Sequence, residues 1–469
     1  MDMAIEYACI MPHPPLIVPA VGRGQEKAVK ATTAALEKVA RRIAALKPDT
    51  IILATPHSVM YGDYIHISPG KTAAGDLGRF GAHDVRMQKN YDTELVAKIS
   101  DTAFEDGIRA GTLGEKDKQL DHATLVPLYF VDQHYTGYNL VRVSLSGLPY
   151  ADHYRFGQCV AKAVKALGRR AVFIASGDLS HKLSASGPYG YAPEGPQFDA
   201  QCTAIMKSGD FAQFLEFDES FFDAAAECGL RSFIELAGVL DGRAVSPYFY
   251  SYEGPFGVGY AVCGFETGGA DEHRRFLERY EQAHKEKLAQ LKNDEDAYVR
   301  LARLSLETYV KTGKQAKLPE GLPDEMRKRR AGVFVSLKKH GRLRGCIGTI
   351  SPVEPSVAQE ILRNAVSAGT GDPRFDVVEA HELPELVYSV DILGKSEPIS
   401  SLDELDTKRY GVIVTSGFRR GLLLPNLEGI DTPQKQVKIA LQKAHIGEEE
   451  SHKMERFEVV RHAAQEGKN

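Results

Sequence analysis

Long apolar runs and paired cysteines are both missing from this chain of 469 residues. No stretch reaches the roughly 18 consecutive apolar residues of a membrane-spanning helix, so we expect no such helix. The first residues also lack the basic and apolar regions of a secretory signal peptide. The 6 cysteines are scattered without CxxC spacing, which argues against a zinc ribbon or a disulfide framework and is typical of a reduced cytoplasm. We therefore expect a cytoplasmic protein.

A large excess of charge of either sign is missing as well. The chain has 58 lysines and arginines against 63 aspartates and glutamates, a formal net charge of −5. This balance gives no bulk attraction to nucleic acid or to an anionic membrane. The basic run Arg327–Arg330 is interpreted as a solvated helix face rather than a nucleic-acid site. We expect neither nucleic acid nor a membrane as a partner.

The composition is otherwise that of a globular protein, and the length predicts two or three domains because a domain usually has roughly 100–200 residues. In the first half, apolar segments typical of buried strands alternate with helical segments. The strand-like segments are 5–11, 50–54, 140–145 and 171–175, the helical ones are 27–45 and 154–167, and a closing hairpin follows at 248–252 and 257–265. This alternation predicts an α/β domain over residues 1–267, with a mostly parallel sheet flanked by helices on both faces.

The composition changes after residue 267. Residues 268–296 are charged and helix-prone with too little apolar surface for a core, so this stretch is interpreted as a linker or connecting helix. A helical pattern begins near residue 297, and the strand-like runs that follow it are 332–337, 346–350, 386–391 and 411–415. Residues 297–469 are therefore predicted to form a second, compact α/β domain.

Histidines follow three of the predicted strands. Met11–His13 and Thr55–His57 both end in proline and then histidine, and the strand at 171–175 leads into Ser176–His181. Ligands of open α/β sheets bind outside the carboxyl ends of the strands, so these side chains are expected to converge. Histidine is a common metal ligand and a common acid or base near neutral pH. A single histidine at a strand end is more often a structural hydrogen-bonding group, but three in matched contexts indicate one metal or catalytic centre.

Two further segments contribute candidate residues. Asp121 stands directly before His122 at the start of an apolar, helix-like run, where it can cap the helix or orient the imidazole. Glu227 and Cys228 follow three alanines, and a carboxylate or thiolate there could complete two imidazoles to a three-ligand site. Two histidines and one carboxylate form the facial triad of non-haem Fe(II) oxygen chemistry. The alternative interpretation of Glu227 is an exposed loop acid.

Taken in chain order, these motifs resemble the class III extradiol dioxygenase superfamily over about residues 5–266. They equally resemble the Memo family, which shares that fold. The segments that carry the resemblance are Pro12–Pro15, Thr55–His57, Asp121–His122, Ser176–His181 and Glu227–Gly229. Any one of them is a weak signal, whereas the ordered set is specific.

The resemblance implies roles for individual residues. In the dioxygenases the first two histidines and a late glutamate hold Fe(II), which makes His13, His57 and Glu227 the ligands here. His181 would then be the catalytic acid or base, and His122 would stabilise negative charge beside the metal. In Memo relatives the late ligand is a cysteine, here Cys228, so the third ligand stays open between two neighbouring residues. Copper and zinc are alternatives to iron, because such sites bind several first-row ions.

The second domain also carries a recognisable pattern. The segments Leu343–Thr349, Asp372–Phe375 and Gly421–Pro425 resemble the AMMECR domain over about residues 298–462. That family implies a compact α/β fold without established chemistry, so Cys346 stays open between a nucleophile and a buried structural cysteine. The fusion resembles the bacterial and archaeal AmmeMemoRadiSam arrangement, which implies a radical-SAM protein as partner. This chain lacks CxxxCxxC and cannot hold that partner's iron–sulfur cluster itself.

Three functions are compatible with these patterns. The first is an Fe(II)-dependent dioxygenase that acts on a catechol-like or related small aromatic substrate with O2. The second is a Memo-type metal-binding or redox module that works with a radical-SAM partner and does not cleave rings, and the adjacent Cys228 and the fused domain favour it. The third is a scaffold with a decayed metal site, against which the retained histidines argue. The substrate, the native metal and the formation of a homo-oligomer stay open.

Overall fold

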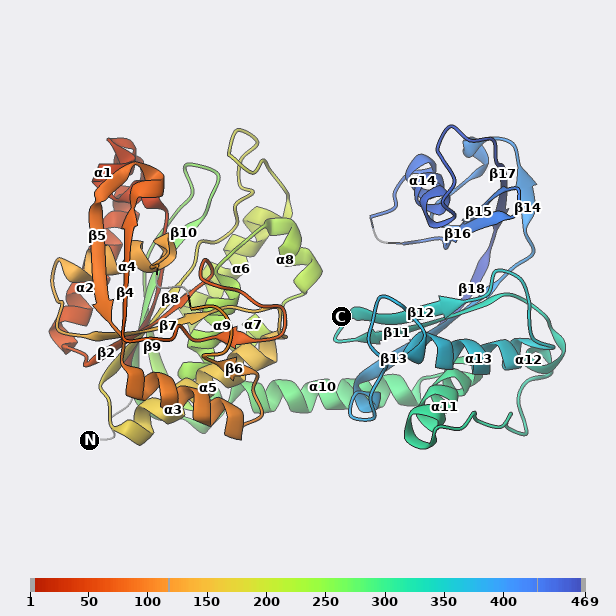
Figure 1. Cartoon of the computed structure of the whole chain (residues 1–469), viewed down its shortest axis with the longest axis horizontal. Helices are drawn as coiled ribbons and strands as arrows, with labels where there is room; N and C mark the ends of the chain where they lie inside the picture. The colour runs from red at the N-terminus through yellow and green to blue at the C-terminus, as the bar shows by residue number, and fades with distance from the viewer. Residues whose placement is uncertain (1–4, 117–118, 428, 465–469) are drawn as a thin grey trace. The chain divides into compact units, whose positions relative to one another are not determined.

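The computed structural model describes residues 5–116, 119–427 and 429–464. The chain divides into two compact units, the first extending to Gln282 and the second beginning at Ala283. Figure 1 labels most of the helices and strands of both units. None of the helices in the described ranges combines the length and the apolar character needed to cross a bilayer.

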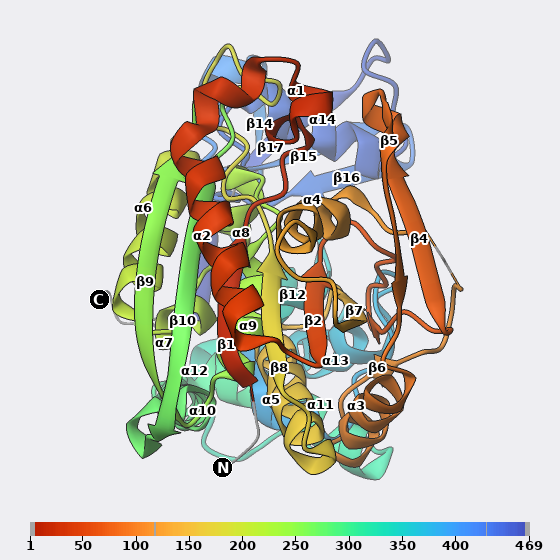
Figure 2. The same cartoon turned by 90° about the vertical axis from the view of Figure 1, so that its left-hand side faces the viewer.

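A six-stranded sheet forms the centre of the first unit. Its strands, in spatial order, are β7 (Asn139–Ser144), β2 (Thr50–Thr55), β8 (Ala171–Ser176), β1 (Ile5–Met11), β10 (Tyr260–Ala270) and β9 (Arg243–Glu253). The first four pair in parallel, whereas β10 runs antiparallel to both β1 and β9. Figure 2 shows these strands side by side with one long helix in front of them. The predicted mostly parallel sheet is therefore confirmed, with an antiparallel hairpin closing one edge.

Helices cover both faces of this sheet. One face carries α2 (Lys30–Leu46) and α4 (His122–Asp132), and the other carries α3 (Thr93–Glu105), α5 (Tyr150–Leu167), α6 (Glu194–Ser208) and α9 (Leu230–Val239). Successive residues of a strand point to opposite faces, so Ile52 joins the core under α5 and α9 while Leu53 joins the core under α2 and α4. Burial on both faces explains why these strands have continuous apolar sequences.

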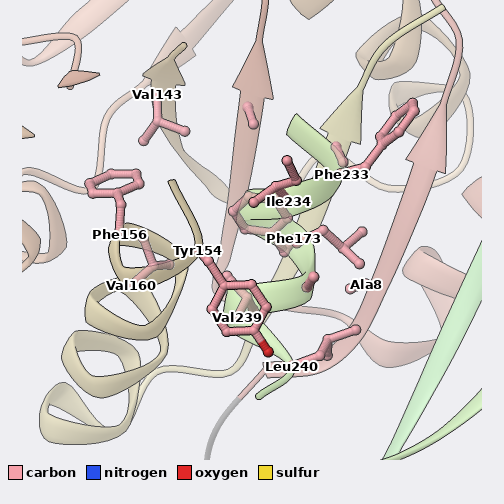
Figure 3. Close-up of a cluster of buried hydrophobic side chains, with 14 of the residues drawn as sticks. Ala8, Val143, Tyr154, Phe156, Val160, Phe173, Phe233, Ile234, Val239 and Leu240 are labelled. Atoms are coloured by element: carbon pink, nitrogen blue, oxygen red, sulfur yellow. The ribbon is translucent and has the colours of Figure 1, made fainter. Parts of the chain in front are cut away.

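The core between the sheet, α5 and α9 is tightly packed. Figure 3 shows Phe173 of β8 among side chains of both helices, including Tyr154 and Phe233. The two helices approach closely because glycines stand at their contact: a Cβ on Gly157 would lie 2.2 Å from the carbonyl oxygen of Glu235, and a Cβ on Gly238 would lie 2.0 Å from that of Tyr154. This contact fixes α9, whose first turn follows a candidate metal-binding segment.

A separate two-stranded hairpin stands beside the sheet. It consists of β4 (Thr72–Leu77) and β5 (Ala82–Asn90), joined by the short helix η3 (Gly78–Phe80). The smaller elements of this unit are η1 (Pro15–Ile17), α1 (Pro19–Gly22), η2 (Gln25–Val29), β3 (Ile65–His66), β6 (Ala110–Gly111), α7 (Ala212–Leu215), α8 (Glu219–Ala225) and η4 (Glu272–Arg274). Helix α10 (Phe276–Asn293) runs across the boundary between the units.

The second unit contains two antiparallel sheets, each of four strands. One has the order β12 (Arg342–Gly348), β11 (Val333–Lys339), β13 (Leu386–Leu393), β18 (Val459–Ala463) and packs against α11 (Ala297–Thr312), α12 (Asp324–Lys328) and α13 (Val357–Thr370). The other has the order β14 (Glu397–Ile399), β17 (Lys453–Phe457), β15 (Gly411–Ser416), β16 (Arg419–Leu423) and packs against α14 (Pro433–Lys443). The turns η5 (Leu383–Glu385) and η6 (Leu402–Glu404) complete this α/β unit.

Candidate metal centre

Three potential metal ligands converge at the carboxyl ends of the parallel strands. His13 follows β1, His57 follows β2, and Cys228 lies in the segment that leads into α9. One ligand atom of each lies within 4.8 Å of those of the other two. His13 is buried, Cys228 is half-buried and His57 is exposed. The group is therefore covered by protein at His13 and accessible to solvent at His57.

Hydrogen bonds fix the orientation of the His13 ring. Its Nδ1 lies 3.0 Å from the Ser176 hydroxyl oxygen, and that hydroxyl donates to the carbonyl oxygen of Ala123 at 2.6 Å. Because the hydroxyl proton is used there, Nδ1–H must donate to Ser176, which leaves the lone pair of His13 on Nε2. This Nε2 lies 3.6 Å from the Cys228 sulfur. The ring therefore presents the nitrogen that a metal ion requires.

A half-buried carboxylate, that of Asp121, connects His57 with His122. The backbone N–H of His57 donates to the Thr55 hydroxyl oxygen at 3.2 Å, and that hydroxyl donates to Asp121 Oδ1 at 2.8 Å. Asp121 also caps α4, whose first residue is His122, by accepting from the backbone N–H of Thr124 at 3.0 Å. The rings of His57 and His122 stack with centroids 4.4 Å apart. One carboxylate thus helps to position both imidazoles.

Asp121 is itself held by a buried cation. Arg142 on β7 is only 1% exposed, and its Nη1 lies 3.4 Å from Asp121 Oδ2. The same guanidinium donates to the Ser68 hydroxyl and to the carbonyl oxygen of Gln119. A buried charge is costly unless it is paired and hydrogen-bonded, and this arginine has both kinds of partner. Sequence reasoning missed Arg142, because a single arginine in an apolar strand gives no sign of which carboxylate it meets.

Glu227 and Cys228 point to different neighbours. The Cys228 sulfur accepts from the backbone N–H of Asp178 at 3.4 Å and faces His13, whereas the Glu227 carboxylate accepts from the backbone N–H of Leu230 at 2.6 Å, at the start of α9. Burial raises the pKa of Glu227 to about 7 and raises the pKa of the Cys228 thiol above its ordinary value. The structure therefore brings Cys228 into the group with His13 and His57, and places the Glu227 carboxylate outside it.

His181 lies near the same group. Its Nε2 is buried without a hydrogen-bond partner among the described residues, and its ring lies 5.1 Å from that of Tyr189. Burial, with a smaller contribution from His57, lowers the pKa of His181 to about 4. Burial likewise lowers the pKa of His122 to about 4. Both imidazoles are neutral near pH 7 and able to accept a proton.

An open cleft of about 1070 Å³ leads to His57 and His122. Its walls come from the β4–β5 hairpin, from η3 and from the segment that precedes α4, and they include Arg79, Phe80 and Arg86. The ring of Phe80 meets that of His122 edge-on, with centroids 5.3 Å apart. No strand was expected in this part of the sequence, so the cleft wall is a feature that only the structure supplies.

The donor set fits a single transition-metal ion. Bonds of about 2.0–2.1 Å to imidazole nitrogen and about 2.3 Å to thiolate sulfur place two ligands of one ion roughly 3–4.4 Å apart. The 3.6 Å between His13 Nε2 and the Cys228 sulfur lies within that range, and small movements would bring in the third ligand. Three protein ligands leave at least one position of the ion open, as in catalytic rather than structural sites.

Comparisons with known proteins identify a family for each half of the chain. Residues 7–263 match the family described as the catalytic LigB subunit of aromatic ring-opening dioxygenase, and residues 299–465 match the AMMECR1 family. A Clostridium acetobutylicum protein is 43% identical over 469 residues, covering 98% of this chain and 99% of that protein. A Thermotoga maritima protein is 49% identical over 170 residues, which cover 36% of this chain and 98% of that protein.

Two solved structures were also matched. The uncharacterized protein PH0010 from Pyrococcus horikoshii is 30% identical with a TM-score of 0.34, and the match covers 36% of this chain and 90% of that one. The uncharacterized protein JW3007 from Escherichia coli K12 is 14% identical with a TM-score of 0.36, and the match covers 56% of this chain and 99% of that one.

Proposed function

We propose, for a chain that belongs to the family of the catalytic LigB subunit of aromatic ring-opening dioxygenases, that the first unit is a mononuclear, non-haem metal protein of the Memo type. An AMMECR1 domain follows this unit. In this proposal His13, His57 and Cys228 hold one first-row ion. The single observation that carries it is the convergence of two imidazoles and one thiol within 4.8 Å. The family resemblance expected from the sequence is confirmed for both halves of the chain.

The thiol is the reason for preferring a Memo-type redox or metal-handling role. A thiolate is a soft ligand that favours Cu(I), Zn(II) or iron over hard ions, and it replaces the carboxylate of the facial triad. The Glu227 carboxylate, which that triad would require, bonds instead to the backbone at the start of α9. In the proposed role a radical-SAM protein is the partner, and the AMMECR1 domain contributes to the same system.

The chain's own residues would act around the ion as follows. When bound, the ion supplies Lewis-acid or redox chemistry at its open position. The unpartnered Nε2 of His181 can accept a proton from a ligand in the centre. His122, stacked on His57 at the base of the cleft, can hydrogen-bond to that ligand. Thr55 and Asp121 hold the His57 segment in place throughout.

Metal content tests this proposal directly. Purified protein is loaded anaerobically with Fe(II), Cu(I) or Zn(II), desalted, and its bound metal is measured. We expect one ion per chain in wild type, loss of the ion in His57→Ala and Cys228→Ser, and retention in Glu227→Gln. His134→Ala is the matched control, because that imidazole bonds to Glu37 away from the centre. Retention of the ion in Cys228→Ser together with its loss in Glu227→Gln would refute the assigned ligand set.

Aromatic ring opening by Fe(II) and O2 is the second candidate function. The family match and the placement of His181 and His122 beside the group of ligands favour it. The test is oxygen uptake by the Fe(II)-loaded protein with a panel of catechols. Uptake that requires both Fe(II) and His181 would support ring opening, whereas no uptake by protein shown to contain iron would leave the Memo-type role.

A further inference from the structure

The cleft beside the metal centre has two features that a simple site for one aromatic ring would not need. Its volume of about 1070 Å³ is slightly above the roughly 300–1,000 Å³ typical of sites for drug-sized ligands. Its wall also presents two arginines, Arg79 on η3 and Arg86 on β5. Both are exposed, and neither has a hydrogen-bond or ion-pair partner in the described part of the chain.

Arginines of the same unit are usually paired. Arg155 bonds to Asp152 at 2.6 Å, and Arg169 bonds to Asp92 at 3.0 Å. Arg79 and Arg86 differ from these arginines because their N–H donors are not used by a carboxylate of the described residues. A guanidinium group binds carboxylate or phosphate through parallel N–H groups. Two unpaired guanidinium groups on one wall therefore suit an anionic ligand.

The acidic residues of the cleft do not neutralise this pair. Asp121 is already engaged by Arg142, Thr55 and Thr124. Asp76 lies opposite Arg86 in the strand register, but its Oδ1 accepts from the backbone N–H of Gly78 at 2.7 Å, and it carries one charge against two. The wall thus keeps a positive charge although the whole chain is net negative.

The rest of the wall suits an aromatic or apolar body. Phe80 is 39% exposed and meets the His122 ring edge-on, and Met87 and Leu120 add apolar surface to the lining. We propose that this cleft binds an extended organic ligand that carries a carboxylate or phosphate group, with Arg79 and Arg86 holding the anion and the other end reaching the metal centre. This inference rests on the metal centre proposed above and adds the chemical class of its ligand.

A pair of probes that differ only in charge tests the inference. Both 3,4-dihydroxycinnamate and its methyl ester can chelate the metal through the catechol, but only the acid carries the anion. Binding of each to the full-length, Zn(II)-loaded protein is measured by calorimetry, so that no redox turnover interferes. We expect the acid to bind roughly tenfold more tightly or better, and this preference to disappear in the double variant Arg79→Gln, Arg86→Gln.

The control is Arg41→Gln, which removes one positive charge from an exposed position on α2 and is compared with each single cleft variant, Arg79→Gln and Arg86→Gln. Equal affinity for acid and ester in wild type, no binding of the acid, or an unchanged preference in the double variant overturns the inference. Displacement of the acid by acetate identifies a carboxylate ligand, and displacement by inorganic phosphate identifies a phosphate ligand. Zinc content is measured on the same samples, so loss of the metal site is distinguished from loss of anion binding.

Discussion

At the scale of single residues, the candidate metal centre depends on side-chain orientations that could be predicted from the sequence only in part. Proline followed by histidine at two strand ends was enough to predict that His13 and His57 converge. The choice between Glu227 and Cys228 could not be made in the same way, because they are neighbours in a loop. The residue before them, Ala226, has a φ of 51°, a left-handed conformation that is rare outside glycine. The turn at Ala226 orients the side chains that follow it, and no pattern in the sequence predicts a left-handed residue at this position.

The pH dependence of metal binding distinguishes these two residues. Desolvation by the surrounding protein lowers the pKa of His13, which is fully buried, and also that of His57, although His57 keeps an exposed side, so both imidazoles are neutral near pH 7 and protons do not compete for them. Burial raises the pKa of the Cys228 thiol, so binding through its sulfur must release one proton. The apparent Zn(II) affinity should then rise about tenfold per pH unit from pH 6 through pH 8.

Competition with a chelator at each pH measures this slope. If the Glu227 carboxylate were the ligand instead, its pKa of about 7 would make the affinity level off above pH 7. We expect Cys228→Ser to weaken binding and remove the slope, and Glu227→Gln to preserve the slope. A plateau above pH 7 in wild type would contradict the thiolate assignment.

At the scale of helices and strands, predictability followed the strength of the apolar pattern. The strands β1, β2 and β8 lie within a residue of their predicted ends, because burial on both faces leaves continuous apolar runs. The hairpin of β4 and β5 was not predicted, since most of its residues are at least partly exposed and its sequence has no strong alternation. Exposure is also what allows this hairpin to form a cleft wall.

The contact between α5 and α9 gives a test at this scale. In Gly238→Ala the new Cβ would lie 2.0 Å from the backbone oxygen of Tyr154, which cannot move without displacing α5. Overpacking of this kind costs about 1–3 kcal/mol. We expect the free energy of unfolding to fall by that amount in chemical denaturation. Gly269→Ala on β10, where nothing lies within 4 Å of the new Cβ, should change stability much less; equal effects of both substitutions would show that the close approach is unimportant.

At the scale of the whole molecule, the chain carries separate hydrophobic cores in its two units. The cores under the central sheet consist of residues of the first unit, and those around β11 and β15 consist of residues of the second. The proposed ligands His13, His57 and Cys228 all belong to the first. A bound ion should therefore stabilise one unit selectively, because ligands raise the stability only of the folded state that binds them.

Calorimetry of the full chain checks this expectation. With zinc at 100 times its dissociation constant, the unfolding free energy of the first unit should rise by about 2.7 kcal/mol, and its transition should shift upwards while the second stays in place. His57→Ala should abolish the shift. Val335→Ala, in the core of the second unit, should lower only the other transition. A metal-dependent shift of both transitions would instead show that the two units unfold together.

The spacing of the three ligands along the chain has a consequence for biosynthesis. His13 and Cys228 are 215 positions apart. The strands that precede His13 and His57 both pair with β8, which lies between His57 and Cys228 in the sequence. During translation the amino-terminal histidines therefore leave the ribosome long before the thiol does. The complete set of ligands forms only after almost the entire first unit has been synthesised and folded. With the proposed ligands, metal binding would be a late event, and a tightly bound ion would require that this unit has been synthesised through Cys228 and folded.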